Sequence, residues 1–548
     1  MLLEAAWGDR VYFPVGGKVS MTAITAPRVY DMIGFGDEVP GVLALVSASR
    51  EYQRRFKKKP RLLLMFKGDS QAGIGGHLVR GKLAYLDRSS IAAAVRKANN
   101  LPTFGDPAAI YKEFLERAGV AAIALDPIKA NVALRSLLSE ANVDIVSRIE
   151  IGQVIRQGDR IQAVQLTKGE VYQAAIWLDS TVNAELAQAA GVKKLQGFET
   201  FSLPESELPV SLIFETVGLT VKRLQDIELI YLKRFADPND SQAQQFLWGA
   251  AGKNQILAKQ FQAEMANDLA KNRTMFVGKD YIDVRSRALS FAYHAFRGKA
   301  LSLKGSGYVF DRGNIAILGS DRLSWNALMC FTTGTEAEAY AIADGQPNGA
   351  ILAEFDYVVQ WFTSLGAKAV SPGTELYIRH AGNVLGAIAP LSGAEMLAGG
   401  VPSQEALGTF GYYLDVRGGI DGLGPLAARY GLTNISFHTA PLFNYGIQHA
   451  LLTNPTNLAV VSPASGFEGY ACAAGRIVEF NVGVGQGVGI ASAIALHQNR
   501  PLASIRNLEV RQVLAATGKL PKIYGRAEYI EAARLAEFET TLGNIAIA

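Results

Sequence analysis

Runs of apolar residues near the start of the chain predict buried parallel strands. Val29–Ile33 and Leu62–Phe66 are mainly apolar, and such runs are typical of strands covered on both faces. Between them, Pro40–Tyr52 has the pattern of a helix, with proline in the first turn, where its missing N–H costs nothing. The order strand, glycine turn, helix, strand within ~40 residues predicts a βαβ unit.

The pattern then changes from long apolar runs to short alternating segments. Pro107–Ala118 and Pro127–Ala141 predict helices, and Val143–Val146 predicts a third parallel strand. Three short segments separated by glycine turns predict an antiparallel meander, followed by a returning apolar strand: Ile149–Ile155, Arg160–Leu166, Glu170–Ala175 and then Ile176–Asp179.

The amino-acid composition changes along the chain and divides it into parts. Residues 21–196 and 439–548 share a glycine-rich, small-residue character, whereas residues 197–438 contain more aromatic residues and longer loops. We therefore expect an α/β fold: a Rossmann-like domain formed by both chain ends, with an antiparallel meander, and an inserted α+β substrate or cap domain. Residues 1–20 look like an extension, with Met21 as the natural start.

Composition excludes several classes of protein. The chain has 548 residues, 49% hydrophobic and 19% charged, with a net charge of +4, which gives no reason to expect a nucleic-acid surface. Only two cysteines occur, and no His, Cys or carboxylate cluster has metal-binding spacing. No apolar run reaches the roughly 18 residues of a membrane span. We expect a cytoplasmic protein without a metal site.

The first glycine turn has the residues of a nucleotide-binding fingerprint. Glycines allow a sharp turn and a close approach to a pyrophosphate, whose charge then lies at a helix N-terminus. Gly34 and Gly36 suit the first two glycine positions, and Gly41 then comes two residues late. Asp37 and Glu38 add negative charge, so both must point away from any pyrophosphate that binds here. A structural turn is the alternative.

Two further segments favour a dinucleotide. The second strand ends at Phe66-Lys67, where a ribose-binding carboxylate is usual; Asp69 can replace it, or Lys67 can favour a 2′-phosphate. Near the other end of the chain lies the run Gly485-Gln486-Gly487-Val488-Gly489. It is predicted to begin a helix over residues 490–497, with its N–H groups toward the electron-rich edge of a ligand ring. Close helix packing through small residues is the alternative.

With these residues the chain resembles the FAD-dependent oxidoreductases with two dinucleotide-binding domains, the glutathione-reductase and fumarate-reductase clan. The likeness lies in the Gly34 turn, in Gly75-Gly76, in the run Trp177–Thr181 and in Gly485-Gln486-Gly487, with Val182 where the family usually has glycine. It implies FAD as the cofactor. It places cofactor-binding roles on Gly34, Gly36, Gly41, Asp69, Gly75, Gly76, Val146, Asp179, Gly485, Gln486 and Gly487.

Catalytic candidates are fewer, because flavin performs the redox step itself. His77 follows the glycine doublet and His449 precedes the C-terminal glycine segment. Alternation predicts strands at residues 377–380 and 412–417, with Arg379 and Arg417 able to grip a substrate carboxylate. Each candidate also has a purely structural interpretation: packed histidines, and an Asp415–Arg417 salt bridge.

These observations predict an FAD-dependent oxidoreductase that transfers hydride between an organic substrate, or NAD(P)H, and flavin. Two alternatives stay open. One is an NAD(P)-dependent enzyme without flavin, favoured by Lys67. The other is a non-catalytic nucleotide-binding protein that has lost its cofactor, favoured by Asp37 and Glu38 in the glycine turn.

Overall fold

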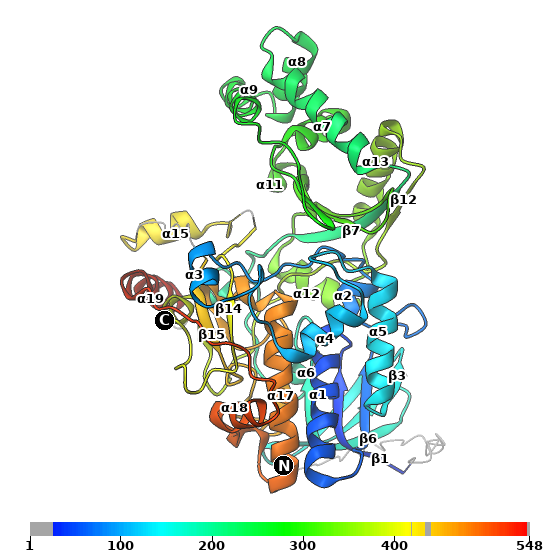
Figure 1. The fold of residues 1–548 in the computed structure, drawn as a ribbon, viewed down its shortest axis with the longest axis vertical. Helices are drawn as coiled ribbons and strands as arrows, with labels where there is room; N and C mark the ends of the chain where they lie inside the picture. The colour runs from blue at the N-terminus through cyan, green and yellow to red at the C-terminus, as the bar shows by residue number, and fades with distance from the viewer. Residues whose placement is uncertain (1–25, 418, 433–439, 545–548) are drawn as a thin grey trace, which may run out of the picture.

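The computed structural model describes residues 26–417, 419–432 and 440–544. They form a body built from both ends of the chain and a cap built from its middle, residues 210–381 (Figure 1). The proposed start at Met21 and the extension before it lie outside the described residues.

A mixed sheet forms the centre of the body, in the order β3-β2-β1-β6-β5-β4, with β16 beside β6. Strands β3, β2, β1, β6 and β16 run parallel, and β6, β5 and β4 are antiparallel. Their bounds are β1 Arg28–Phe35, β2 Leu62–Phe66, β3 Val143–Ser147, β4 Ile151–Gln157, β5 Arg160–Leu166, β6 Val171–Asp179 and β16 Leu458–Val460.

This topology confirms the βαβ unit, the third parallel strand and the antiparallel meander. One detail of the prediction was wrong, because residues 170–175 and 176–179 form a single strand, β6. No turn residue interrupts this segment. The third strand of the meander therefore continues directly beside β1, with Phe35 opposite Asp179.

Helices cover the body sheet. Helices α1 and α17 cross at glycines and lie side by side (Figure 1). The body helices are α1 Val39–Phe56, α2 Gly76–Val79, α3 Ala93–Ala98, α4 Ala109–Arg117, α5 Pro127–Glu140, α6 Glu185–Ala189, α16 Cys472–Gly475, α17 Val478–Gln498, α18 Asn507–Ala516 and α19 Tyr529–Gly543. Among the described residues no single helix is both long and apolar enough to cross a membrane. Residues 469–475 and 478–498, which are bent by 89° relative to each other, reach that length and composition only as a pair.

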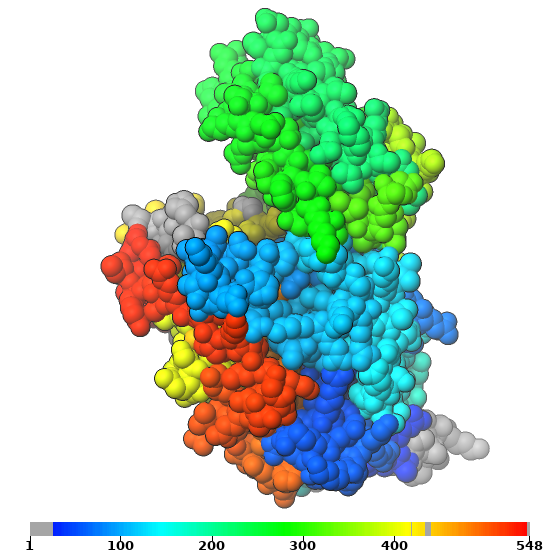
Figure 2. Space-filling model, in the orientation of Figure 1, coloured from blue at the N-terminus to red at the C-terminus, as the bar shows by residue number. Residues whose placement is uncertain are grey.

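The cap contains an antiparallel sheet in the order β12-β7-β11-β10-β9-β8, packed against helices around an aromatic core that includes Phe214, Trp325 and Phe362. Figure 2 shows the cap as a separate lobe on the body. Its elements are β7 Val210–Val217, α7 Val221–Ala236, α8 Ser241–Ala250, α9 Gln255–Ala270, β8 Phe276–Val277, β9 Tyr281–Asp283, α10 Ala288–Arg297, α11 Leu303–Ser306, β10 Tyr308–Ile317, β11 Arg322–Cys330, α12 Gly334–Ile342, α13 Gly349–Leu365 and β12 Ala369–Pro372.

From Leu391 onward the chain packs with the body again. Strand β13 pairs with β17, and β14 pairs with β15, so this segment joins the C-terminal part of the body. The core of the cap thus ends near Ala381, earlier than the boundary at 438 that the change in composition suggested. The elements are β13 Leu391–Ser392, α14 Gly393–Leu397, β14 Gly408–Gly411, α15 Leu423–Arg429, β15 Leu442–Tyr445 and β17 Phe467–Glu468.

Candidate functional site

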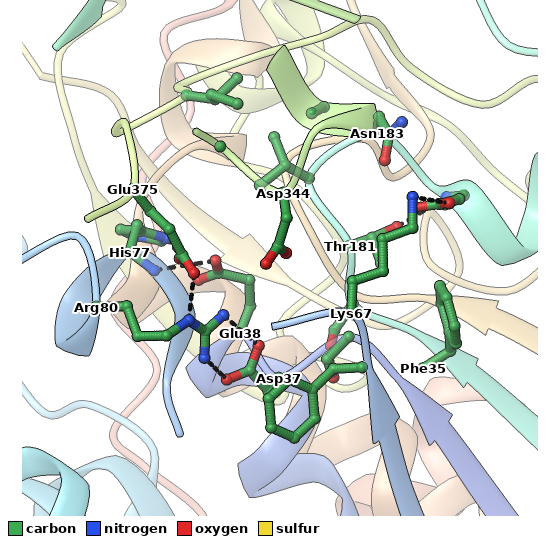
Figure 3. A pocket seen from close by; sticks show the side chains of 18 of the residues that line it. Phe35, Asp37, Glu38, Lys67, His77, Arg80, Thr181, Asn183, Asp344 and Glu375 are labelled. Atoms are coloured by element: carbon green, nitrogen blue, oxygen red, sulfur yellow. Dashed lines mark hydrogen bonds and ion pairs between the residues drawn. The ribbon is translucent and has the colours of Figure 1, made fainter. Parts of the chain in front are cut away.

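A crevice opens where the body sheet meets the cap. It lies at the carboxyl ends of β1, β2 and β6, where the strand order reverses direction, and this is where open α/β sheets bind ligands. The cap supplies the end of α12 and the segment after β12 (Figure 3). The remaining cavity measures about 70 Å³.

The glycines of the turn take different positions in the nucleotide-binding fingerprint from those predicted. Gly36 has φ +92°, and a side chain there would meet the Thr181 backbone nitrogen at 2.7 Å. A side chain on Gly41 would overlap that of Ser180, which is the close helix–strand contact expected of the third glycine. Gly34 instead lies within β1 and packs on Leu45. Gly36 and Gly41 are therefore the first and third glycines, no residues are inserted, and Glu38 stands at the second.

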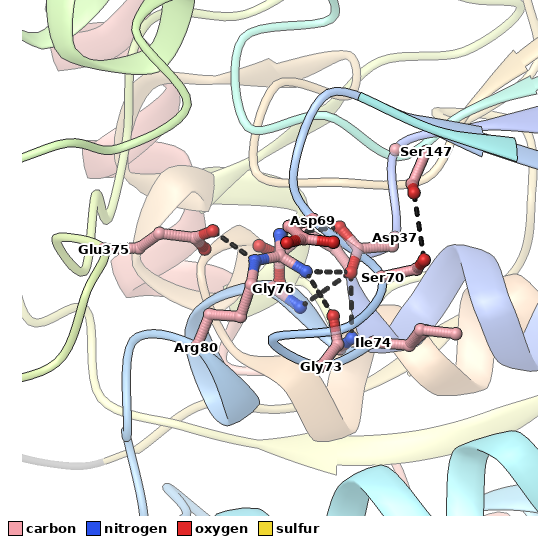
Figure 4. Close-up of polar contacts among 12 residues, drawn as sticks. Asp37, Asp69, Ser70, Gly73, Ile74, Gly76, Arg80, Ser147 and Glu375 are labelled. Carbon is pink, nitrogen blue, oxygen red and sulfur yellow. Dashed lines mark hydrogen bonds and ion pairs between the residues drawn. The ribbon is translucent and has the colours of Figure 1, made fainter. Parts of the chain in front are cut away.

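Asp37 points into the crevice, contrary to the expectation that it turns away. Its carboxylate accepts the N–H of Gly75 at 2.9 Å and of Gly76 at 3.3 Å (Figure 4). It also forms a two-pronged ion pair with Arg80, whose Nε bonds to Glu375 of the segment after β12. All three side chains are more than nine-tenths buried. Arg80 thus ties the glycine turn of the body to the cap.

Glu38 also points into the crevice. Its Oε1 accepts the His77 N–H at 3.2 Å, and its Oε2 lies 2.5 Å from His77 Nδ1. The His77 ring stacks on Tyr377, with centroids 5.1 Å apart, and the Arg379 guanidinium lies 4.5 Å from the centre of the Tyr377 ring. A continuous line of contacts therefore runs from the glycine turn, through His77, to a second polar cluster.

The crevice is strongly acidic. Five carboxyl groups line it, those of Asp37, Glu38, Glu185, Asp344 and Glu375, against two fixed cations, Lys67 and Arg80. Burial raises the pKa of Glu375 to about 8 and that of Asp344 to about 6; nearby Asp37 adds to both shifts, and Arg80 opposes them. Lys67 is already paired with Glu185.

A pyrophosphate does not fit the crevice as it is arranged here. The backbone frame suits it, since Gly36, Gly41 and the Gly75-Gly76 turn are in place. The carboxylates do not, because they take the N–H groups of residues 75–77. Two like charges ~4 Å apart repel by about 1 kcal/mol in water and by about 4 kcal/mol at an effective dielectric constant of 20.

Three other predicted cofactor residues lie away from the crevice lining. Asp69 forms an exposed ion pair with Arg148. Val146 packs with the apolar residues on one face of the body sheet. Asp179 is buried and accepts hydrogen bonds from Thr181 and from the Ala187 N–H at 2.9 Å, so it organises the turn that leads into α6. Burial raises the pKa of Asp179 to about 6.

The C-terminal glycines do not open a helix. Helix α17 begins at Val478, so Gly485, Gln486 and Gly487 lie inside it. A side chain on Gly485 would meet the Pro40 carbonyl oxygen of α1 at 2.6 Å, and Gln486 accepts the Ile110 N–H at 2.8 Å. The alternative interpretation, close helix packing through small residues, describes Gly485 and Gly489, which face α1, whereas Gly487 packs on Ile447 and Leu407.

The second polar cluster, the arginine cluster, consists of Arg379, Arg417 and Arg476 with Asp87, Asp311 and Asp415. Asp415 Oδ2 lies 3.1 Å from the Arg476 Nη2 and 3.3 Å from the Arg417 Nε, which confirms the predicted salt bridge. Asp87 lies 3.8 Å from Arg476, and Arg379 donates to the Pro209 carbonyl at 2.6 Å. Neither predicted strand forms, since residues 377–380 and 412–417 are irregular.

Three guanidinium groups in this cluster face three carboxylates, because Arg417 Nη1 also donates to Asp311 Oδ2 of the cap strand β10 at 3.3 Å. Arg379 and Arg476 are 2% and 3% exposed, and within the described part of the chain the Nε of each has no hydrogen-bond partner. Burial, together with Arg417 and Arg476, lowers the pKa of Arg379 to about 10, so it stays charged at neutral pH. Buried donors without partners are rare and indicate a missing acceptor.

His449 lies apart from both groups. It packs between Phe467 and Phe480 and lines a separate apolar cavity of about 270 Å³ beside Tyr445. Burial lowers its pKa to about 4, so the ring is neutral at pH 7. The structure therefore brings together three of the four catalytic candidates, His77, Arg379 and Arg417, and separates His449 from them.

Sequence reasoning missed Arg80, Asp344 and Glu375 as parts of the site. Arg80 and Glu375 lie 295 positions apart, and only the placement of the cap joins them. The sequence did contain a signal for the positions of the glycines in the fingerprint. Gly36 and Gly41 already have the five-residue spacing that separates the first and third glycines. Among the described residues, no group of three or more His, Cys, Asp or Glu is arranged to hold a metal ion.

Comparisons with known proteins give one family. A family model described as FAD dependent oxidoreductase matches residues 71–514, beginning just after the glycine turn and the second strand. No curated protein matches the chain in sequence.

Solved structures resemble the chain over most of its length. They include a geranylgeranyl bacteriochlorophyll reductase-like protein from Thermoplasma acidophilum, 9% identical over 95% of this chain and 91% of that one, with a TM-score of 0.36. The myxobacterial chondrochloren halogenase CndH is 11% identical over 95% and 97%, at 0.35. PqsL from P. aeruginosa is 11% identical over 93% and 99%, at 0.36.

Proposed function

Because this chain belongs to the FAD-dependent oxidoreductase family, we propose that it transfers hydride between an anionic organic substrate and flavin. NAD(P)H is the alternative hydride donor. The observation that carries the choice of an anionic substrate is the pair of buried Nε donors, on Arg379 and Arg476, that have no hydrogen-bond partner among the described residues.

The charge of the cluster indicates a carboxylate. Taking an uncompensated charge out of water is costly, and among the described residues Arg379 pairs with no carboxylate, so a bound anion would compensate its charge. Guanidinium also matches carboxylate geometry with two parallel hydrogen bonds. The free Nε atoms of Arg379 and Arg476 are the donors that such a substrate would use.

The position of the cluster supports this role. It lies between body and cap, where ligand pockets commonly form, and the stacked rings of His77 and Tyr377 connect it to the crevice. Arg417 also borders an open cavity of about 520 Å³ lined by Arg273, Arg285 and Arg312, with Asp283 and Asp311. This cationic cleft would draw anions from solvent toward the cluster.

The chain's own residues would bind and orient the substrate. FAD, when bound, supplies the hydride acceptor. Arg379 and Arg476 would fix the carboxylate, and Asp415 would hold Arg417 and Arg476 in place. His77 lies between the two groups, within reach of Glu38, and would hold a proton at Nδ1.

One experiment tests this proposal directly. The protein is loaded with FAD, made anaerobic, and mixed separately with 2-hydroxy acids, 2-amino acids, their neutral amides, NADH and NADPH. Loss of the visible flavin bands with carboxylates, and not with the matching amides, is the expected result. Equal reduction by acids and amides would contradict an anionic substrate, and reduction by NADPH or NADH alone would make the nicotinamide the hydride donor.

The closed crevice favours one other function. A protein that kept this fold without its cofactor would also place its own carboxylates at the glycine turn. Such a protein would stay colourless at every FAD concentration.

A further inference from the structure

We propose that Glu38 occupies the position of a dinucleotide pyrophosphate and thereby limits how tightly the crevice binds FAD. This inference rests on the proposed function for the identity of the cofactor. It concerns a residue of the glycine turn that decides cofactor affinity.

The register of the turn places Glu38 at the pyrophosphate position. Gly36 makes the tight turn at φ +92°, and Gly41 makes the close contact with Ser180. The residue between them, two after Gly36, is the one whose missing side chain lets the backbone approach the pyrophosphate in this fold. In this chain that residue carries a carboxylate.

Glu38 makes the contacts that a phosphate oxygen would make. A phosphate at such a turn binds backbone N–H groups, and Glu38 Oε1 accepts the N–H of His77 at 3.2 Å. A side chain on Gly76 would overlap the Glu38 carboxylate, which shows how closely it packs against the turn. Asp37 takes the N–H groups of Gly75 and Gly76. Together they occupy the backbone N–H groups of residues 75–77 that an anion would otherwise bind.

The surroundings hold Glu38 in this position. Its side chain is 12% exposed, beneath the cap segment that carries Glu375. Arg80 links that segment to Asp37, and the remaining cavity is about 70 Å³. FAD can therefore bind only when the Glu38 carboxylate moves out, and the lost contacts and the charge repulsion reduce the affinity.

Removing the carboxylate should tighten FAD binding. The test is a titration of FAD, followed by fluorescence quenching, against the natural chain, Glu38→Gly and Glu38→Gln, with circular dichroism to verify folding. Relief of one like-charge contact in a partly buried site predicts a Kd at least about tenfold lower for Glu38→Gly. Glu38→Gln, which loses the charge and keeps the bulk, should fall between the two.

Glu405→Gly is the matched control, because Glu405 is exposed, lies in a turn outside the crevice lining, and undergoes the same change of charge. Its Kd should equal that of the natural chain. A Glu38→Gly Kd within twofold of the natural value, or an equal gain from Glu405→Gly, would overturn the inference.

The two proposals fail in different ways. Tight binding by Glu38→Gly with none by the natural chain supports the role of Glu38 and contradicts the proposed function. FAD binding by both proteins with no reduction of the flavin by any donor contradicts the proposed function alone, and the ratio of the two Kd values still decides the role of Glu38.

Discussion

Two polar groups lie along the same seam between body and cap, and they have opposite character. In the crevice, five carboxyl groups face two fixed cations, and Asp37 and Glu38 bond to the backbone of residues 75–77. In the arginine cluster, three guanidinium groups face three carboxylates, and the Nε donors of Arg379 and Arg476 have no hydrogen-bond partner within the described residues. In the crevice, carboxylates occupy the backbone donors of residues 75–77, whereas in the arginine cluster buried donors of Arg379 and Arg476 lack an acceptor within the described residues. This difference indicates that the carboxylates of the crevice must move before a cofactor binds there, and that the arginine cluster binds an anion.

The largest expected effect tests the closure of the crevice. Asp37→Asn removes the charge that Arg80 pairs with, and breaking a buried ion pair costs about 3–5 kcal/mol. We expect Asp37→Asn to lower the free energy of unfolding by about 3 kcal/mol. This is the low end of that range, because Glu375 remains beside Arg80. Urea denaturation measures it.

Asp69→Asn is the control for this experiment, since it removes the same kind of charge from an exposed pair with Arg148. Its unfolding midpoint should not change measurably. Equal losses for Asp37→Asn and Asp69→Asn would show that the crevice network contributes no special stability.

The next prediction concerns the arginine cluster. Arg476→Lys keeps the charge and loses the planar fork that binds a carboxylate in two places. Truncating a buried charge partner costs about 2–5 kcal/mol, so kcat/KM for a carboxylate substrate should fall at least about 30-fold. Most of the change should appear in KM, because the same contacts hold the substrate before reaction.

Arg534→Lys, at an exposed pair with Glu531, provides the comparison and should leave both kinetic constants unchanged. An unaltered KM in Arg476→Lys would show that the substrate does not bind at the arginine cluster and that those arginines are structural residues.

The smallest expected effect is a pH dependence of stability in the crevice. The pKa of Glu375 is raised from its usual value to about 8, so its neutral form is favoured in the folded protein. Its stabilising contribution is complete below the unfolded pKa of 4.5 and is lost as pH rises through about 8. Asp344 acts in the same direction, with a pKa near 6. Arg80 and Asp37 also face Glu375.

We therefore expect the free energy of unfolding to fall between pH 6 and 8, by at most about 1.4 kcal/mol per pH unit from Glu375. Glu375→Gln should flatten this part of the profile, which urea midpoints at several pH values would reveal. A profile that keeps its slope in the variant would assign the pH dependence to other groups.

Local sequence patterns predicted most of the body. The apolar runs at Leu62–Phe66 and Val143–Val146 form β2 and β3, and the parallel pairing followed from the βαβ pattern. The function of the glycines was harder to predict, because a glycine in a strand, a turn or a helix contact looks the same in one sequence. Gly34 and Gly485 were misplaced for this reason.

The spacing of four between Gly485 and Gly489 was a signal for helix packing, since residues four apart share one face of a helix. Other parts of the site depend on tertiary structure alone. Nothing near Arg80 in the sequence indicates Glu375, because the cap and the body meet only after folding. Nothing near Arg476 indicates Asp87, because the two ends of the chain come together only in the folded body. His77, Arg379 and Arg417 were predicted one by one, without the contacts that relate them.

The most direct test of the account is a visible absorption spectrum of the natural chain and of Glu38→Gly, each saturated with FAD and then passed through a desalting column. We expect flavin bands shifted from those of free FAD in both proteins at saturation, with Glu38→Gly retaining more flavin after the column. Spectra identical to free FAD at every concentration, in both proteins, would contradict it.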